Sequence, residues 1–366
     1  MIKKKKHEII IPLCILMFFI TSIISIYSSE SILPIYYNNL RIKQLIWYIV
    51  SFIIFIILLF IKNEKILRYS KIIYITSIIL LIIVLILGQK VNNTRGWFDF
   101  GFISFQPSEL TKVGLILYIS KLLNDFRFEE NITYKKELLL IIKIIIITLI
   151  PSILVFMEPD TGAVISYFII TFILILISEI RLRWTFILLI LGIILFIILS
   201  LFYIKSPNGF IKLFGNGIYY RIFRIIDWKN SSGMQLENSI ISISTSGLYG
   251  NGLKNLPIYF PEPYTDFIFT VYTNIFGLIG SILLIILIII FDTRIILISK
   301  NTTKTINKYI ITGFLISFMY PQIQNISMTI GLLPITGIPL PFISYGGSSL
   351  IISFIMCAYI INAYNE

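Results

Sequence analysis

The chain has 366 residues, of which 57% are hydrophobic and only 13% are charged. Soluble domains carry about 25% charged residues, and one soluble core of this length cannot bury so many apolar side chains. The net charge is +12, but Lys and Arg form short clusters between apolar runs, which indicates topology signals and contacts with membrane lipids rather than nucleic-acid binding. The chain has one histidine, His7, and two cysteines in apolar runs, Cys14 and Cys357, so we expect no histidine chemistry, disulfide or metal cage.

Apolar runs long enough to cross a membrane recur along the chain, since a span needs about 20 apolar residues. The runs cover 9–27, 44–61, 71–88, 107–123, 138–156, 162–178, 184–204, 266–291, 309–331 and 342–364. We therefore predict an all-α polytopic membrane protein of about ten transmembrane helices, forming a single domain over residues 1–366. A long outer loop, about 205–265, separates helices seven and eight. No small-residue cleavage site follows the first run, so we interpret it as a retained span.

The basic residues predict the orientation. With the N-terminus inside, the inner segments hold 18 Lys and Arg residues, whereas the short outer segments hold four. Positive residues favour the cytoplasmic side. We expect a multi-pass protein of the cytoplasmic membrane with both termini in the cytoplasm.

Two polar motifs lie early in the segments assigned to the outside. In 92–112, Pro107 suits a first helical turn, and Glu109 and Lys112, three residues apart, share one helix face. Each charge alone would cost about 2.5–3.5 kcal/mol at the bilayer centre, so we expect them to pair or to face a polar cavity. In the turn 158–162, Asp160 either caps the next helix or belongs to a site.

The long outer loop contains a third motif. It carries Arg221, Arg224 and Asp227 before the stretch 233–253. The spacing of its apolar residues predicts a helix lying at the membrane interface. That apolar face comprises Leu236, Ile240, Ile243 and Leu248, and the helix is expected to end at Gly247, Gly250 and Gly252.

The last two motifs lie close to the final spans. Asp266 enters an apolar run at its outer end, where it is either a helix cap with Thr265 or a carboxylate whose pKa is raised by burial, suited to general-base work. The stretch 331–350 interrupts apolar sequence with prolines and glycines, which is tolerated at membrane depth only beside protein or a watery cavity. These residues predict an outward-facing polar cavity but do not separate a transporter from an enzyme.

At these motifs the sequence resembles the SEDS family, which includes RodA, FtsW and SpoVE. The resemblance covers nearly the whole chain and rests on SFQPSELTK (104–112), EPDTG (158–162), 235–253, 261–269 with 277–280, and 331–350, which contains GIPLPFISYGGSSL. It implies a peptidoglycan glycosyltransferase that polymerises lipid II outside the membrane, with a class B penicillin-binding protein and other wall-synthesis proteins as partners. The stretch 328–339 looks slightly more like RodA, which implies cell elongation rather than division or sporulation.

The resemblance also implies roles for individual residues. Asp266 matches the family's essential aspartate, Trp97 its loop tryptophan, and Glu109 with Lys112 its acid–lysine pair. Asp266 would be the base that activates the 4-hydroxyl of the acceptor sugar in an inverting reaction. The remaining expected substrate-binding residues are Arg95, Asp160, Arg221, Gln235, Ser344, Gly346 and Gly347.

Cationic groups would stabilise the leaving pyrophosphate, and Lys112, Arg95 and Arg221 are the candidates. No dedicated metal site or cofactor is expected, although a divalent cation, Mg²⁺ or Mn²⁺, shared with the pyrophosphate is an alternative.

The chain departs from the family pattern at three places. Tyr264 stands where histidine is usual, Gly96 where a basic residue is usual, and Asn274 with Ile275 where an acidic pair is common. Arg95 is a candidate replacement for the basic residue. Two other functions stay open: a flippase for lipid-linked precursors, and a non-catalytic scaffold of the wall-synthesis complex, which the missing acid favours. Paired repeats, which would support a flippase, are not evident.

Overall fold

A computed structural model describes residues 8–34, 39–91, 94–99, 101, 104–129, 132–226 and 233–365. Seven helices in this part of the chain are long and apolar enough to cross a membrane. They are α1 (Ile10–Ser29), α2 (Leu40–Leu59), α4 (Ser70–Leu87), α6 (Tyr134–Met157), α8 (Leu182–Lys205), α12 (Ile268–Asn301) and α14 (Gly347–Asn365). The shorter α7 (Thr161–Ile177) and the more polar α5 (Pro107–Arg127) and α13 (Thr305–Thr329) lie where the other three spans were predicted.

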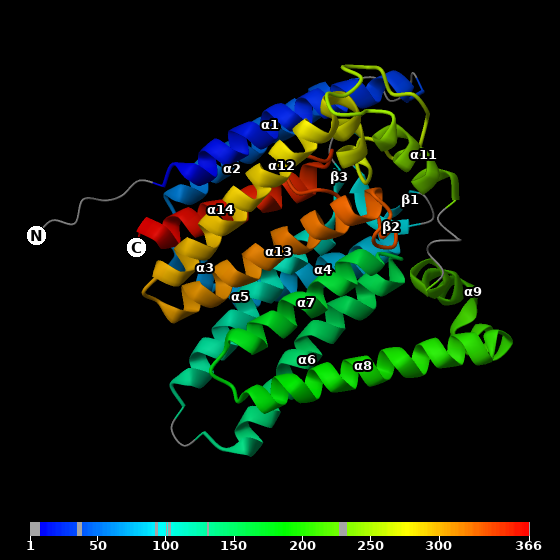
Figure 1. The fold of residues 1–366 in the computed structure, drawn as a ribbon. Coiled ribbons are helices and arrows are strands. Elements are labelled where there is room, and N and C mark those ends of the chain that lie inside the picture. Colours follow the sequence, from blue (N-terminus) through cyan, green and yellow to red (C-terminus); the bar gives the residue numbers. More distant parts are fainter. Residues whose placement is uncertain are drawn as a thin grey trace, which may run out of the picture.

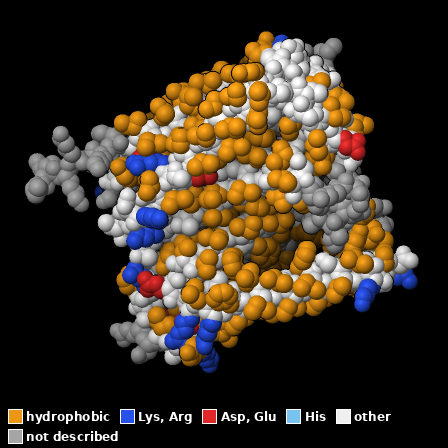
Figure 2. Space-filling view, in the orientation of Figure 1, with side chains coloured by type: hydrophobic (Ala, Val, Ile, Leu, Met, Phe, Trp, Pro, Cys, Tyr) orange, Lys and Arg blue, Asp and Glu red, His pale blue; other side chains and the backbone are white. Residues whose placement is uncertain are grey.

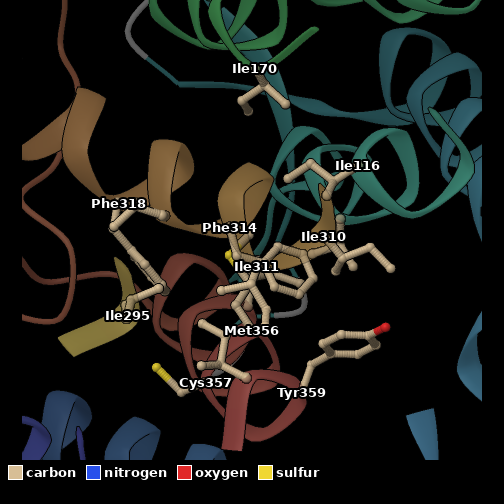
Figure 3. Packing of buried hydrophobic residues seen from close by; sticks show 14 of the residues in the cluster. Ile116, Ile170, Ile295, Ile310, Ile311, Phe314, Phe318, Met356, Cys357 and Tyr359 are labelled. Atoms are coloured by element: carbon tan, nitrogen blue, oxygen red, sulfur yellow. The ribbon is translucent and has the colours of Figure 1, made fainter. Parts of the chain in front are cut away.

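The helices pack around a dense apolar core (Figure 3). Side chains from α5, α7, α12, α13 and α14 meet there, and Phe314, Phe318 and Cys357 are almost completely buried. Both cysteines are buried and free, in agreement with the sequence analysis. The first and last described residues lie at the same end of the bundle (Figure 1), as an even number of spans requires.

The eighth predicted span continues to Asn301, ten residues beyond the apolar run. Two charged residues ended the run in the sequence, but both have partners in space. Asp292 is hydrogen-bonded by the side-chain amide of Gln322 on α13. Arg294 forms an ion pair with Glu8, whose carboxylate is fully buried, and its guanidinium lies 5.4 Å from the Tyr364 ring centroid. A paired charge is tolerated inside a bundle, so the helix does not end there.

Helix α8 is the least embedded of the spans. Only Thr185 and Tyr203 of its 24 residues are buried. In Figure 1 it runs away from the body of the bundle, and Figure 2 shows a hollow between them. Its exposed Ile, Leu and Phe side chains therefore require lipid around them.

The outer loops build a cap over the end of the bundle opposite the termini (Figure 1). A small antiparallel sheet, ordered β1-β2-β3, comprises β1 (Gln89–Val91), β2 (Thr94–Asp99) and β3 (Ser104–Phe105). Trp97 pairs with Gln89 in its register. The remaining helices are the short η1 (Glu30–Ile32), α3 (Asn63–Arg68) and α11 (Gly233–Ser244), and the longer α9 (Pro207–Ile226), which is kinked at Gly215.

The helix predicted in the long loop is α11, but its buried face differs from the expected one. Ser239 and Ser242 are buried together with Leu236, whereas Ile240 is 43% exposed. The reason is that the serine hydroxyl finds partners: Ser239 Oγ lies 2.6 Å from Thr270 Oγ1 and donates to the carbonyl of Thr329. An apolar periodicity could not reveal these bonds.

We predict that the outer cap faces the periplasmic or extracellular side, as the charge bias requires. Cysteine introduced at Glu237, exposed on α11, should react with a membrane-impermeant thiol reagent in intact cells. Cysteine introduced at Asn301, exposed at the opposite end of α12, should react only after the membrane is opened. The buried Cys14 and Cys357 keep the background low. Labelling at position 301 but not 237 would reverse the orientation.

Candidate functional site

Asp266 lies in the turn that precedes α12, half-buried at the outer end of the bundle. Its backbone carbonyl accepts a 2.8 Å hydrogen bond from Asn325 Nδ2 of α13. Its carboxylate faces the irregular segment after α13, because a Cβ placed on Gly337 would lie 3.4 Å from Asp266 Oδ2. The next two residues, Phe267 and Ile268, are fully buried and anchor the turn.

The helix-cap interpretation of Asp266 is wrong. The residue at the N-cap of α12 is Phe267, and no side chain caps this helix. Thr265 instead donates to the carboxylate of Glu262, 2.9 Å away. Burial raises the pKa of Asp266 to about 7, and the nearby carboxylates of Glu262 and Asp160 add to the shift. A carboxyl group that titrates near neutral pH is well placed to exchange a proton with a ligand.

The segment 331–346 packs directly against this turn. Ser344 Oγ donates to the carbonyl of Thr265 over 2.6 Å and accepts from the backbone N–H of Leu340. The backbone N–H of Tyr345 donates to the carbonyl of Tyr264. Ser344 therefore fixes the backbone beside Asp266, in a stretch where the expected irregular structure is confirmed.

Gly346 and Gly347, which were predicted to bind substrate together with Ser344, contact α2. Gly346 N–H donates to Gln44 Oε1 of α2, and a Cβ on Gly347 would overlap the indole of Trp47. These contacts give both glycines a packing role at the start of α14. Their expected contact with substrate stays a prediction.

A charged cluster lies beside Asp266, at the first turns of α5 and α7. Lys112 Nζ is 2.7 Å from Glu109 Oε1, and both side chains are nearly buried, which confirms the predicted pair. Asp160 caps α7 by accepting from the N–H of Ala163, and its other oxygen accepts from Gln106 Nε2 at 3.2 Å. Burial, the largest influence, raises the pKa of Asp160.

Glu158 is the residue of this site that the sequence analysis did not select. Its side chain is fully buried, and neither carboxyl oxygen has a hydrogen-bond partner among the described residues. Burial raises its pKa to about 8, with a further contribution from Asp160. An unpartnered buried carboxylate is costly, so this group holds its proton at neutral pH. The only sequence signal was its place in the turn 158–162.

The structure explains one departure from the family pattern. A Cβ on Gly96 would lie 3.1 Å from Glu158 Oε2, so a basic side chain at position 96 would sit beside that carboxyl. Arg95 is exposed, whereas Gly96 is buried. Arg95 therefore does not replace the missing cation next to Glu158. Trp97, the residue after Gly96 in β2, is partly buried.

The remaining candidates lie farther along the outer loop. Gln235 Nε2 donates to the carbonyl of Pro261 at 3.2 Å, so it supports the turn that carries Asp266. Arg221 lies on α9, and its side chain is outside the described part, as are residues 227–232. Asn274 is fully buried and donates to the carbonyl of Ser242. The position of the missing family acid is thus used to join α11 to α12.

The same carboxylates are the possible protein ligands for a metal ion at this site. Within the described ranges, no three His, Cys, Asp or Glu side chains are grouped so that they could hold an ion. Glu109 is paired with Lys112, and Asp160 is bound to α7. A divalent cation at this site would therefore need oxygen ligands from its substrate, and its presence stays a prediction.

The fold and site define a polytopic membrane protein with a cluster of buried carboxyl groups at the end of the bundle opposite its termini. A family model of FtsW, RodA and SpoVE, described as a cell cycle protein, matches residues 8–366. The chain belongs to this family, the SEDS family of the sequence analysis.

Named relatives and solved structures agree with this assignment. The probable peptidoglycan glycosyltransferase FtsW of Wigglesworthia glossinidia brevipalpis is 35% identical over 335 residues, covering 88% of this chain and 82% of the relative. That of Escherichia coli O157:H7 is 32% identical, covering 84% and 72%.

Among solved structures, a chain from a study of polymerisation and crosslinking by a peptidoglycan synthase complex has a TM-score of 0.77 at 21% identity, covering 97% of this chain and 96% of that one. Rod shape determining protein RodA of Thermus thermophilus has a TM-score of 0.68 at 19% identity, covering 97% and 95%. At these identities the likeness shows the shared fold.

We predict that Glu109 and Lys112 depend on each other for stability. Lys112→Met should lower the free energy of unfolding by about 3–5 kcal/mol, because it leaves the Glu109 carboxylate buried without its partner. Adding Glu109→Gln should restore most of that loss. Thermal unfolding in detergent measures both variants. Equal losses in the single and double variants would argue against an energetic pair.

We predict that Glu158 makes the protein less stable as the pH rises. The pKa of Glu158 is raised from 4.5 to about 8 on folding, so the folded state binds the extra proton, and the free energy of unfolding falls between these two pH values. Glu158→Gln should remove the contribution of Glu158 to this dependence, leaving the smaller one of Asp266, and gain about 1–3 kcal/mol over the parent by pH 8. Melting temperatures from pH 5 to 8 measure it. Glu237→Gln, at an exposed position, is the control, and parallel curves for parent and Glu158→Gln would contradict the assignment.

Proposed function

We propose that this protein is a peptidoglycan glycosyltransferase that polymerises lipid II at the outer face of the cytoplasmic membrane. One observation carries the proposal: Asp266, half-buried at the outer end of the bundle, has a carboxylate that caps no helix, and its pKa is raised to about 7. Membership of the FtsW, RodA and SpoVE family and the names of the relatives support the activity.

In this mechanism Asp266 removes the proton from the 4-hydroxyl of the acceptor sugar as that oxygen attacks the anomeric carbon of the donor. The bond from that carbon to the lipid pyrophosphate breaks on the opposite face, so the configuration inverts. Pyrophosphate leaves as an anion and needs no proton, so one base is sufficient, unlike in inverting hydrolases.

The leaving pyrophosphate needs positive charge near it. Lys112 is already paired with Glu109, so it offers a partly neutralised charge, while Arg95 is exposed. Arg95 and Arg221 are therefore the stronger candidates, with Mg²⁺ or Mn²⁺ bound through the pyrophosphate as the alternative. Trp97, partly buried in β2, would pack against a sugar ring.

The cellular role is division rather than elongation. The slight likeness to RodA in 328–339 favoured elongation, but the curated relatives described above are named FtsW. The partner is a class B penicillin-binding protein. Its support is the likeness to a chain of a peptidoglycan synthase complex that couples polymerisation to crosslinking.

A non-catalytic scaffold is the second candidate function. Asn274 favours it, because this position lacks the family acid and its amide is bound to the Ser242 carbonyl. Purified protein given labelled lipid II, with and without the penicillin-binding protein, separates the candidates. Glycan strands support the enzyme, transfer between leaflets a flippase, and neither product the scaffold.

We predict that Asp266→Asn abolishes polymerisation without unfolding the protein. General-base catalysis contributes about 10²–10⁴-fold, and asparagine is a far poorer base than aspartate. Stability should be retained, because the Asp266 side chain caps no helix. In the parent, the rate should rise with pH through about 7 as the carboxyl group ionises. Gel analysis of glycan from labelled lipid II measures the rate.

The matched control for this prediction is Asp125→Asn, exposed on α5, which should polymerise at the parental rate. Melting temperature and capture of the penicillin-binding protein confirm that Asp266→Asn is folded. A folded Asp266→Asn variant that polymerises near the parental rate refutes the assignment of the base.

A further inference from the structure

Helix α12 is broken at Gly277, whose φ of 67° and ψ of −163° are not helical. The break divides it into a short outer helix, 268–276, and a long span, 278–301. In an unbroken helix the N–H groups of Leu278 and Ile279 would donate to the carbonyls of Asn274 and Ile275. The break leaves these two N–H groups and two carbonyls without their helical partners. Among apolar neighbours they need other hydrogen-bond partners.

A glycine-rich loop supplies those partners. We call residues 246–252, which follow α11, the strap. Leu278 N–H and Ile279 N–H donate to the strap carbonyls of residues 247 and 248 at 3.0 and 3.2 Å. Strap N–H groups of residues 251 and 252 donate to the carbonyls of Asn274 and Ile275 at 2.8 and 3.2 Å. The strap thus takes the place of the two missing helical bonds on each side of the break.

The crossing of strap and helix leaves no room for side chains. Gly250 has φ +83°, and a Cβ there would overlap the carbonyl of Ile275. A Cβ on Gly277 would overlap the backbone at Leu248 and Gly250. Gly252 differs in one respect: it has φ +80°, but the nearest atom to its Cβ position is 3.8 Å away. The two strap glycines share a conformation and differ in the space around them.

The short outer helix is what connects the crossing to Asp266. It begins two residues after Asp266 and ends at the strap. Its sides are held to α11 by the Ser239–Thr270 contact and by Asn274, which donates to Ser242. The carboxylate of Asp266 in turn faces Gly337. A shift at the break would therefore move the turn that carries this carboxylate.

We propose that the Gly250–Gly277 crossing is a positioning device for the reaction, which holds the short outer helix so that the Asp266 carboxylate meets the acceptor sugar. Gly250 and Gly277 are positioning residues, since they act only through the backbone that leads to Asp266. This inference rests on the proposed function, because it assigns a purpose to the placement of the base.

The test compares Gly250→Ala with Gly252→Ala in the full-length protein with its penicillin-binding protein. Both substitutions force alanine into a left-handed conformation, but only Gly250→Ala also displaces the helix backbone. We expect Gly250→Ala to lower kcat on labelled lipid II about 100-fold, the scale for misplacing a reacting group by about 1 Å, with KM little changed. Gly252→Ala should stay within about threefold of the parent.

A second readout follows the environment of Asp266 itself. Loosening the turn admits water, so the pKa of Asp266 should fall towards its ordinary value. The acidic limb of the pH–rate profile should then move to lower pH in Gly250→Ala and stay in place in Gly252→Ala. If Gly250→Ala does not fold, insertion of one glycine after Tyr249 shifts the strap hydrogen bonds without adding a side chain and should move the acidic limb the same way.

A measurement without substrate separates the positioning role of the crossing from the proposed glycosyltransferase function. Carbodiimide modification of Asp266, followed by mass spectrometry, should be faster in Gly250→Ala than in Gly252→Ala. Faster modification together with a parent that makes no glycan would refute the proposed function and retain the positioning role. Equal modification rates, or equal loss of kcat in both variants with an unmoved pH limb, would overturn the positioning role.

Discussion

Backbone polar groups that lie among apolar neighbours must be hydrogen-bonded, and the structure is arranged around this requirement. The spans meet it within each helix, except at the break in α12, where the strap supplies the hydrogen bonds. The irregular segment 331–346 meets it with side chains from several helices: Gln324 donates to the carbonyl of Pro334, Asn325 to that of Ile338, and Tyr48 to that of Phe342. The polar site lies beside this segment because that is where non-helical backbone has been made stable at the membrane.

The carboxyl groups of the site differ in role because their surroundings differ. Glu109 is neutralised by Lys112, and Asp160 is bound to the start of α7 and to Gln106. Glu158 is enclosed without a partner and holds its proton. Asp266 is half-buried, caps no helix, and has a pKa raised to about 7. One acidic residue is thereby left free to accept a proton while its neighbours keep the site intact.

The positions of the spans could be predicted from the sequence, because each span is a long continuous run of apolar residues. The sequence also revealed the Glu109–Lys112 pair, since three residues of helix bring the two together. It failed where a partner is distant in the chain. The carboxylate of Glu8, 286 residues away, is what allows α12 to continue past Arg294. The proximity of Gly96 to Glu158 and the buried serine face of α11 likewise depend on tertiary contacts.

The ion pair between Glu8 and Arg294 has a consequence for the movements open to the bundle. It joins the beginning of α1 to α12, beside Tyr364 near the end of α14, at the face where both termini lie. Separating these helices would leave the buried Glu8 carboxylate without its partner, at a free-energy cost of several kcal/mol. The pair therefore opposes separation of α1 from α12 at the end of the bundle where the termini lie. The ion pair thus fastens the start of α1 to α12 and to the end of α14 at a single point near the termini.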